Sequence, residues 1–224
     1  MVNSIFEYGD VWKEDRGAMA PGKLKLTDQN IVFKNAKTGK VDQINNGEVE
    51  SVFWQRLAGA YGLRIQTKNP SLYRFGGFQN DERGKLREFF KEFYNLDMKT
   101  KEFSLTGRNW GTVNFDPVVL SFDIDKVPAF EIPLAYVSNC STSKNEVTLE
   151  FQPNDDAPSC MMEMRFYVPT DPNPDVDAVE AFKANVMSRA GITQATGDAI
   201  ANFNGVQCLT PRGRYDIKIF TTFI

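Results

Sequence analysis

The stretch Asn80-Asp-Glu-Arg-Gly-Lys-Leu-Arg-Glu-Phe-Phe-Lys-Glu-Phe93 decides how the first hundred residues fold. Its apolar residues recur at i, i+3, i+4 and i+7, the spacing of one face of an α-helix: Leu86, Phe89, Phe90 and Phe93. Asn80 is a suitable N-cap, and the acidic residues that follow it suit the positive end of the helix dipole. The stretch therefore predicts an amphipathic helix whose phenylalanine-rich face needs a sheet to cover it.

The residues before this helix alternate between apolar and polar side chains, as half-buried strands do. The predicted strands cover residues 22–27, 30–34, 41–44, 48–56, 63–67 and 72–75. Asn46-Gly47 is the strongest signal for a two-residue hairpin, here between the third and fourth of these strands. Antiparallel strands followed by one amphipathic helix resemble the outline of a pleckstrin-homology-like barrel.

Residues 99–191 repeat this outline. Strands are predicted over residues 102–106, 112–115, 118–124, 129–132, 146–151 and 161–168. A helix follows, with Val179, Phe182, Val186 and Met187 on one face, and Gly191 is a natural helix stop. The fold class is therefore mainly β with some α, as two pleckstrin-like barrels in tandem, each of antiparallel strands closed by a C-terminal helix.

The last residues differ from the rest because no closing helix follows them. Residues 206–209 and 215–220 are strand-like and come after a second hairpin-type pair, Asn204-Gly205. We interpret them as the beginning of a third module. The predicted domains are thus residues 1–98, 99–191 and 192–224.

The absence of histidine restricts the chemistry. Without an imidazole there is no Ser-His-Asp triad, no Cys-His pair and no proton shuttle that titrates near neutral pH. The three cysteines, Cys140, Cys160 and Cys208, are far apart and contain no CxxC motif. We therefore expect reduced thiols, no catalytic residues, no metal site and no cofactor.

Charge and hydropathy restrict the partners. Residues 1–98 carry 15 Lys and Arg against 13 Asp and Glu, while the whole chain has a net charge of −3. Neither half has the strong basic excess of a stand-alone DNA-binding domain. No apolar run approaches the roughly 18 residues of a membrane span, and the first residues lack a signal peptide's pattern. We expect an intracellular chain without a membrane partner.

A lysine cluster is one candidate site. Five lysines lie within 18 residues of each other: Lys23, Lys25, Lys34, Lys37 and Lys40. Such a cluster is suited to phosphates, either of a phosphoinositide headgroup or of the DNA backbone. The alternative is a solvated edge whose lysines discourage pairing with other strands.

Exposed apolar residues form the other candidate site. If Met162, Met164, Phe166 and Val168 face the core, then Met161, Glu163, Arg165 and Tyr167 face outward. Arg165 is then placed to pair with a glutamate across the strands, and Met161 and Tyr167 remain as exposed apolar area. Trp110 is likewise out of phase with the apolar residues of its strand. Aromatic residues and methionine are enriched in protein interfaces, although each of these residues would also fit under a loop or against the neighbouring module.

Several longer phrases resemble one family. They include Phe33-Lys-Asn-Ala-Lys-Thr-Gly-Lys-Val-Asp42, Phe130-Glu-Ile-Pro-Leu134, Lys144-Asn-Glu-Val-Thr-Leu-Glu-Phe151, Met164-Arg-Phe-Tyr-Val-Pro169 and Cys208-Leu-Thr-Pro-Arg-Gly-Arg-Tyr-Asp-Ile217. Together with Asn109-Trp-Gly-Thr-Val113, they are similar to the beginning of the structure-specific recognition protein family, the small subunit of the FACT histone chaperone.

The resemblance implies more than the residues alone do. In that family, residues like 1–98 form an N-terminal pleckstrin-like domain, and residues like 99–190 form a second one that pairs with the dimerisation domain of the large subunit. FACT is nuclear and reorganises nucleosomes during transcription, replication and repair without consuming ATP. The sequence lacks most of the family's middle domain, its acidic stretch and the HMG box of animal members. Direct contact with histones or DNA by this chain is therefore expected to be weak or indirect.

Overall fold

The computed structural model describes residues 6–104, 110–170, 177–192, 199–209 and 212–220. It divides the chain into two compact units, residues 1–191 and 192–224. The first unit contains two successive groups of strands, each with a helix; we call residues 6–100 the first module and residues 101–191 the second module. This pattern is the mainly-β architecture that the alternation predicts.

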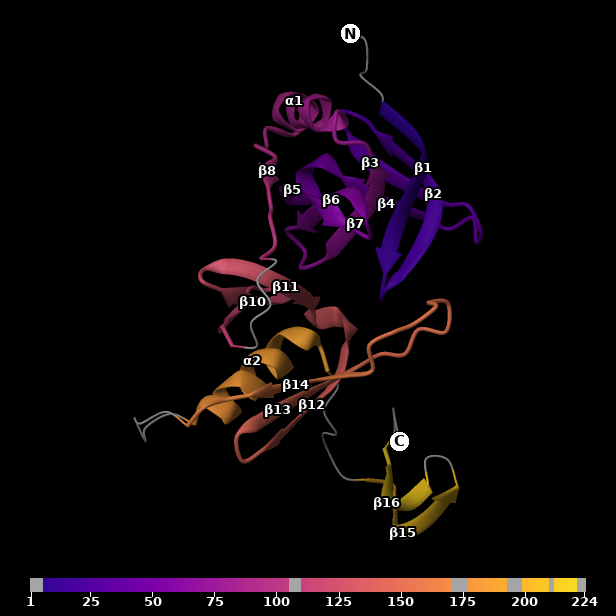
Figure 1. Cartoon of the computed structure of the whole chain (residues 1–224). Coiled ribbons are helices and arrows are strands. Elements are labelled where there is room, and N and C mark those ends of the chain that lie inside the picture. Colours follow the sequence, from indigo (N-terminus) through magenta and orange to yellow (C-terminus); the bar gives the residue numbers. More distant parts are fainter. Residues whose placement is uncertain (1–5, 105–109, 171–176, 193–198, 210–211, 221–224) are drawn as a thin grey trace. The chain divides into compact units, whose positions relative to one another are not determined.

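The first module is built on one strongly bent antiparallel sheet (Figure 1). Its elements are β1 (Phe6–Asp15), β2 (Ala18–Leu26), β3 (Asn30–Asn35), β4 (Val41–Asn45), β5 (Val49–Leu57), β6 (Ala60–Thr67), β7 (Leu72–Phe78) and the short β8 (Lys99–Thr100). The strand order is β4-β3-β2-β1-β7-β6-β5-β8, so β1 joins the two halves. β8 pairs in parallel with β5.

The junction between β1 and β7 needs glycine. Trp12 of β1 lies opposite Gly76 of β7, and a Cβ added to Gly76 would stand 2.5 Å from the Trp12 indole nitrogen. Gly77 has a φ of +104°, which an L side chain rarely adopts. The two halves of the sheet can approach each other here only because both residues lack a side chain.

The predicted hairpin at Asn46-Gly47 is wrong. These residues belong to a 3₁₀ turn, η1 (Asn46–Glu48), and β4 and β5 lie near opposite edges of the sheet. The Asn46 amide donates hydrogen bonds to the carbonyl oxygens of Asp28 (2.8 Å) and Phe93 (2.7 Å). The asparagine therefore fastens the crossing between the sheet halves to the helix instead of forming a tight turn.

The predicted helix is α1 (Glu82–Tyr94), which lies across one end of the strands (Figure 1). Leu86, Phe89 and Phe90 are almost completely buried, and Phe93 is partly buried. The N-cap is Asp81 and not Asn80, and its side chain makes no capping hydrogen bond. The helix ends at Asn95, which adopts the left-handed conformation.

The second module has two three-stranded antiparallel sheets. Its elements are β9 (Thr112–Phe115), β10 (Val119–Ile124), β11 (Val127–Pro133), the 3₁₀ turn η2 (Leu134–Tyr136), β12 (Val137–Ser143), β13 (Glu146–Phe151), β14 (Glu163–Tyr167) and α2 (Ala178–Ala190). One sheet has the order β11-β10-β9 and the other β12-β13-β14. α2 buries Val179, Phe182 and Val186 and ends at Gly191, as its spacing predicts.

In this module one strand prediction fails and one observed strand was not predicted. Residues 102–104 form no strand, and residues 105–106 lie outside the described residues. The strand β12 was not predicted, because its polar sequence Val-Ser-Asn-Cys-Ser-Thr-Ser places only Val137 and Cys140 in the buried class. Its exposed positions are small polar residues, which carry little alternation signal.

The second unit is a two-stranded hairpin of β15 (Ala201–Leu209) and β16 (Arg212–Ile219). Asn204-Gly205, which the sequence suggested as a hairpin-type pair before the first of these strands, lies inside β15. Gly205 lies within β15, with a φ of +64°, where the register with β16 shifts between Phe203 and Val206. The pair therefore forms a bulge in the strand.

Candidate protein-interaction surface

Met161 and Tyr167 are among the exposed large apolar side chains of the second module. Met161 lies two residues before the start of β14 and Tyr167 ends the strand, and 55% and 72% of their surfaces are exposed. Phe166, between Tyr167 and Arg165, is buried, so the strand alternates as predicted. This arrangement leaves apolar area in water at both ends of an edge strand.

Arg165 lies between these apolar residues on the same strand. Its guanidinium contacts Glu163 on β14 and Glu146 on the neighbouring strand β13, the latter at 3.7 Å. The hydrogen bond to Glu163, together with the two negative charges, raises the pKa of Arg165. The charged pairs therefore form a polar strip with Met161 and Tyr167 on either side of it.

Two further exposed apolar residues, Met162 and Trp110, lie outside β14. Met162 was expected to face the core, but it precedes β14 and is 53% exposed, because the period-two alternation holds only within the strand. Trp110 is 61% exposed and precedes β9, in the other sheet of the module. The exposed apolar area at the start of β14 is therefore larger than predicted, and Trp110 lies near the start of a different strand.

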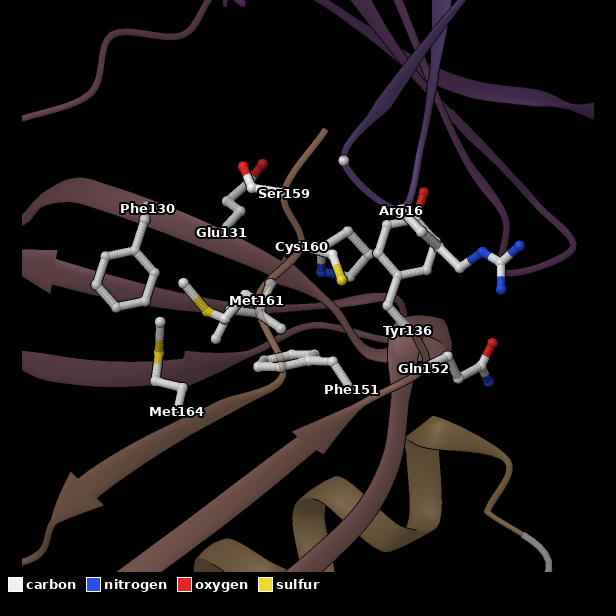
Figure 2. Close-up of a pocket in the computed structure, with 13 residues that line it drawn as sticks. Arg16, Phe130, Glu131, Tyr136, Phe151, Gln152, Ser159, Cys160, Met161 and Met164 are labelled. Atoms are coloured by element: carbon white, nitrogen blue, oxygen red, sulfur yellow. The ribbon is translucent and has the colours of Figure 1, made fainter. Parts of the chain in front are cut away.

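A mainly apolar cavity of about 440 Å³ lies beside Met161. Phe130 of β11, Phe151 of β13 and Met164 of β14 line it, and Figure 2 shows their side chains gathered with Met161 around one space. Cys160 also lines it, with its Sγ 3.6 Å from Met162 Sδ. Sequence reasoning missed this cavity, because the segment between β13 and β14 shows no periodicity.

The Cys140 thiol differs from that of Cys160. Cys140 is 4% exposed, and its pKa is raised mainly because burial disfavours the thiolate. Cys160 is only partly buried. No group of three or more His, Cys, Asp or Glu side chains in the described part of the chain is arranged to hold a metal ion.

A buried ion cluster joins the first module to the second. Arg64 on β6 and Glu131 on β11 have side chains that are each 2% exposed, and Arg64 Nε lies 3.0 Å from Glu131 Oε2. Lys101 pairs with the other carboxylate oxygen of Glu131. Phe53 lies beneath both cations, 5.4 Å from the Arg64 guanidinium and 5.8 Å from the Lys101 ammonium. Every charge in this cluster therefore has a partner.

A second polar contact joins the turn between β1 and β2 to the second module. The buried Asn154 amide donates to the carbonyl oxygens of Asp15 (3.0 Å) and Arg16 (3.1 Å). Nearby, Tyr136 donates to Glu14, which Arg74 binds at 2.7 Å. Burial, followed by the charge of Glu14, raises the pKa of Tyr136. The phenol therefore stays a donor over the neutral range.

The structure divides the lysine cluster into two parts. Lys23 of β2 lies directly opposite Lys34 of β3, and with Lys25 these residues line one shallow hollow on the outer sheet face. Lys25 also pairs with Glu7 at 3.2 Å. Lys40 and Lys37 lie in the turn between β3 and β4 and do not line the hollow. All five side chains are exposed, as predicted.

No helix among the described residues has both the length and the apolar character needed to cross a membrane.

Three family models match the chain in succession. The POB3-like N-terminal PH domain matches residues 6–100, the structure-specific recognition protein (SSRP1) model matches residues 103–195, and the SSRP1 PH domain matches residues 198–224. The pleckstrin-like fold expected from the strand and helix pattern is therefore confirmed.

Similar proteins carry the same name. The chain is 53% identical over 218 residues to the FACT complex subunit SSRP1 of Homo sapiens, covering 97% of this chain and 31% of the relative. It is 52% identical over 223 residues to the FACT complex subunit Ssrp1 of Drosophila pseudoobscura pseudoobscura, covering all of this chain and 30% of the relative. The chain thus spans about a third of the length of these curated relatives.

A solved structure agrees with the sequence matches. One chain of the structure of the Spt16D Pob3N heterodimer is 27% identical and superposes with a TM-score of 0.69. The match covers 74% of this chain and 97% of that one. Together, the successive family models, the relatives and this structure show that the chain belongs to the structure-specific recognition protein (SSRP1) family.

Proposed function

We propose that this chain is a non-catalytic pairing module of a FACT small subunit and binds the large subunit through its second module. The observation that carries the proposal is the match to 97% of a chain solved as one half of the Spt16D Pob3N heterodimer. In this proposal the module acts in the nucleus on chromatin. It couples the small subunit to the ATP-independent reorganisation of nucleosomes in transcription, replication and repair.

The surface we assign to this pairing contains Met161, Arg165, Tyr167 and Trp110. Met161, Tyr167 and Trp110 are each more than half exposed, and such large apolar side chains supply most of the binding energy when a partner covers them. Arg165 is held by two glutamates and favours partners that complement this strip of charge. A stable heterodimer buries about 1,600 Å² in total, so the surface extends beyond these residues.

Isothermal titration calorimetry against the large subunit's dimerisation domain tests the proposal. We expect one-to-one binding with a Kd in the nanomolar range, and a loss of at least about ten-fold, or 1.4 kcal/mol, for Met161→Asp with Tyr167→Asp. The matched control is Met19→Asp with Val41→Asp, which places the same charges at exposed apolar residues of the first module. No binding by the folded wild-type chain refutes the proposal, and normal binding by the first double variant moves the interface elsewhere.

The register of β2 and β3 favours a second candidate function, which is binding of phosphate groups by the first module. Lys23 and Lys34 are directly opposite, and like charges in that position repel unless an anion lies between them. We propose that DNA-backbone or phosphoinositide phosphates bind at the hollow lined by Lys23, Lys25 and Lys34. Lys37 and Lys40 extend the basic surface at the turn.

Fluorescence anisotropy with a short DNA duplex, and co-sedimentation with phosphoinositide vesicles, test this second candidate. We expect binding at low salt that weakens steeply as salt rises, and that is lost with Lys23→Glu and Lys34→Glu. Lys85→Glu with Lys91→Glu, two exposed lysines of α1, is the charge-matched control. Equal losses for both double variants would show non-specific attraction, and no binding to either probe would remove this candidate.

A further inference from the structure

The two modules differ at one strand position. In the first module, β1 lies between β2 and β7 and pairs with both, which joins the two halves of the sheet. A 3₁₀ turn precedes the fifth strand of the first module, and a 3₁₀ turn likewise precedes β12 of the second. This landmark equates β12, β13 and β14 with β5, β6 and β7, and β9, β10 and β11 with β2, β3 and β4.

In this comparison no strand among the described residues of the second module, which exclude 105–109 and 171–176, is a counterpart of β1. Its two sheets have the orders β11-β10-β9 and β12-β13-β14, so β9 and β14 are edge strands at the position where β1 would join them. Within the described ranges no strand pairs with the outer edge of β9 or of β14. Unpaired edges of this kind are templates for another strand.

The register of β13 and β14 shows which backbone groups of β14 are left to pair with a further strand. Phe151 N–H donates to Met162 O (2.9 Å) and Val168 N–H donates to Asn145 O (2.8 Å), which sets the alternation of the β13–β14 ladder. Even-numbered residues of β14 therefore bond to β13. The N–H and C=O groups of Glu163, Arg165 and Tyr167 point away from β13, toward the open edge.

The same reasoning applies to β9. Asp116 N–H donates to Val119 O (3.0 Å), so the even-numbered residues of β9 bond to β10. The backbone groups of Val113 and Phe115 point outward. The two edges together offer an alternating row of donors and acceptors to one strand that runs antiparallel to both, as β1 does between β2 and β7.

The aromatic core of the second module is also less completely buried than that of the first. In the first module Phe33, Phe75 and Phe90 are at most 1% exposed, whereas Phe115 and Phe122 of the second module are only half-buried. Phe115 and Phe166 lie on the two edge strands, and both contact Phe182 of α2, at ring distances of 5.2 and 5.4 Å. A strand that bridges these edges would cover this aromatic cluster.

We propose that a single extended strand of the FACT large subunit occupies the β1-equivalent position of the second module and pairs with β9 and β14. The inference rests on the proposed pairing function and specifies its geometry as addition of a β-strand. The occupant is a period-two segment with apolar side chains on the face toward Phe115 and Phe166. The choice of occupant follows from the match to one half of a heterodimer and from exposed Met161 and Tyr167, which flank the same edge.

Residue-resolved amide hydrogen exchange of the full chain, with and without the large subunit's dimerisation domain, tests the inference. We expect exchange to slow by at least about ten-fold at Val113, Phe115, Glu163, Arg165 and Tyr167 when the partner is added. The even-numbered residues of the same strands are the internal control, because their amides are already bonded within the sheets. Binding that leaves the odd-numbered amides unchanged overturns strand addition but keeps the proposed function.

A proline variant provides a second, independent measurement. Arg165→Pro removes one outward N–H without breaking the β13–β14 ladder, and proline is tolerated at such an edge position. We expect the Kd for the large subunit to rise at least ten-fold, about 1.4 kcal/mol. Thr142→Pro is the matched control, because the Thr142 N–H points outward at the opposite edge of the same sheet.

Three outcomes decide between the possibilities. Binding that is weakened more by Arg165→Pro than by Arg165→Ala, which removes the same side chain but keeps the N–H, and that is unchanged by Thr142→Pro supports strand addition. Equal binding by both folded variants overturns it, as does a self-associated dimer in light scattering whose own exchange pattern already protects these amides. No binding by the wild-type chain overturns the proposed function and the inference together.

Discussion

Glu131 is a buried, charged side chain that we expect to contribute strongly to the stability of the folded chain. Its carboxylate receives Arg64 Nε at 3.0 Å and also Lys101, and both Glu131 and Arg64 are 2% exposed at the side chain. Substitution Glu131→Ala leaves a buried guanidinium with its main partner removed, which costs about 3–5 kcal/mol. Urea unfolding at equilibrium measures this loss.

The control for this prediction is Glu92→Ala, an exposed glutamate of α1 for which we expect a change within about 0.5 kcal/mol. Similar values for the two variants would show that the Arg64–Glu131 pair adds nothing to stability. Because Arg64 belongs to the first module and Glu131 to the second, the loss also measures how strongly the modules hold each other.

At the scale of elements, α1 packs its apolar face into the core of the first module. Phe90 is fully buried and its ring contacts Phe89 and Tyr94 at 5.3 Å. Phe90→Ala therefore removes a large side chain from a closed core, and we expect it to cost about 3–5 kcal/mol. Phe93→Ala, at a partly buried position on the same helix, should cost clearly less, and thermal unfolding followed by circular dichroism compares the two.

The helices could be predicted from the sequence because their apolar residues recur on one face over about two turns. The strand predicted over residues 72–75 lies within β7, and the one predicted over residues 146–151 coincides with β13, because apolar and polar residues alternate along both stretches. β1 was missed because its sequence contains Gly9-Asp10 and shifts register between Tyr8 and Val11, which interrupts the alternation. The hairpin predicted at Asn46-Gly47 was wrong because the Asn46 side chain donates hydrogen bonds to carbonyl groups that are distant in the sequence. Local sequence rules do not describe such contacts.

The candidate surface could be predicted only where it follows the strand period. Alternation along β14 correctly exposes Tyr167 and buries Phe166, while Met162 lies beyond the strand and escapes the rule. The Arg64–Glu131 pair joins residues that are 67 positions apart, and the cavity beside Met161 is lined by residues from several strands. Contacts between residues so far apart leave no periodic pattern in the sequence.

At the scale of the whole molecule, the chain divides after Gly191. The hairpin of β15 and β16 is a compact unit of its own, and Leu209 and Ile200 are 87% and 67% exposed. We expect a chain that ends at Gly191 to unfold with the same free energy as the full chain, within about 0.5 kcal/mol. Calorimetric unfolding of the two lengths measures this, and a marked loss in the shorter chain would show that the hairpin stabilises the first unit.

The position of β1 between β2 and β7 has a consequence during synthesis. The N-terminal strand meets β7 only after residue 76 has been made, and the helix that covers their core ends at Tyr94. At about 5–20 residues per second, roughly 4–16 seconds pass between the emergence of the first strand and the last turn of that helix. During this interval the apolar residues of β1 and β2 are not yet covered by the helix, and exposed apolar surface of this kind promotes aggregation.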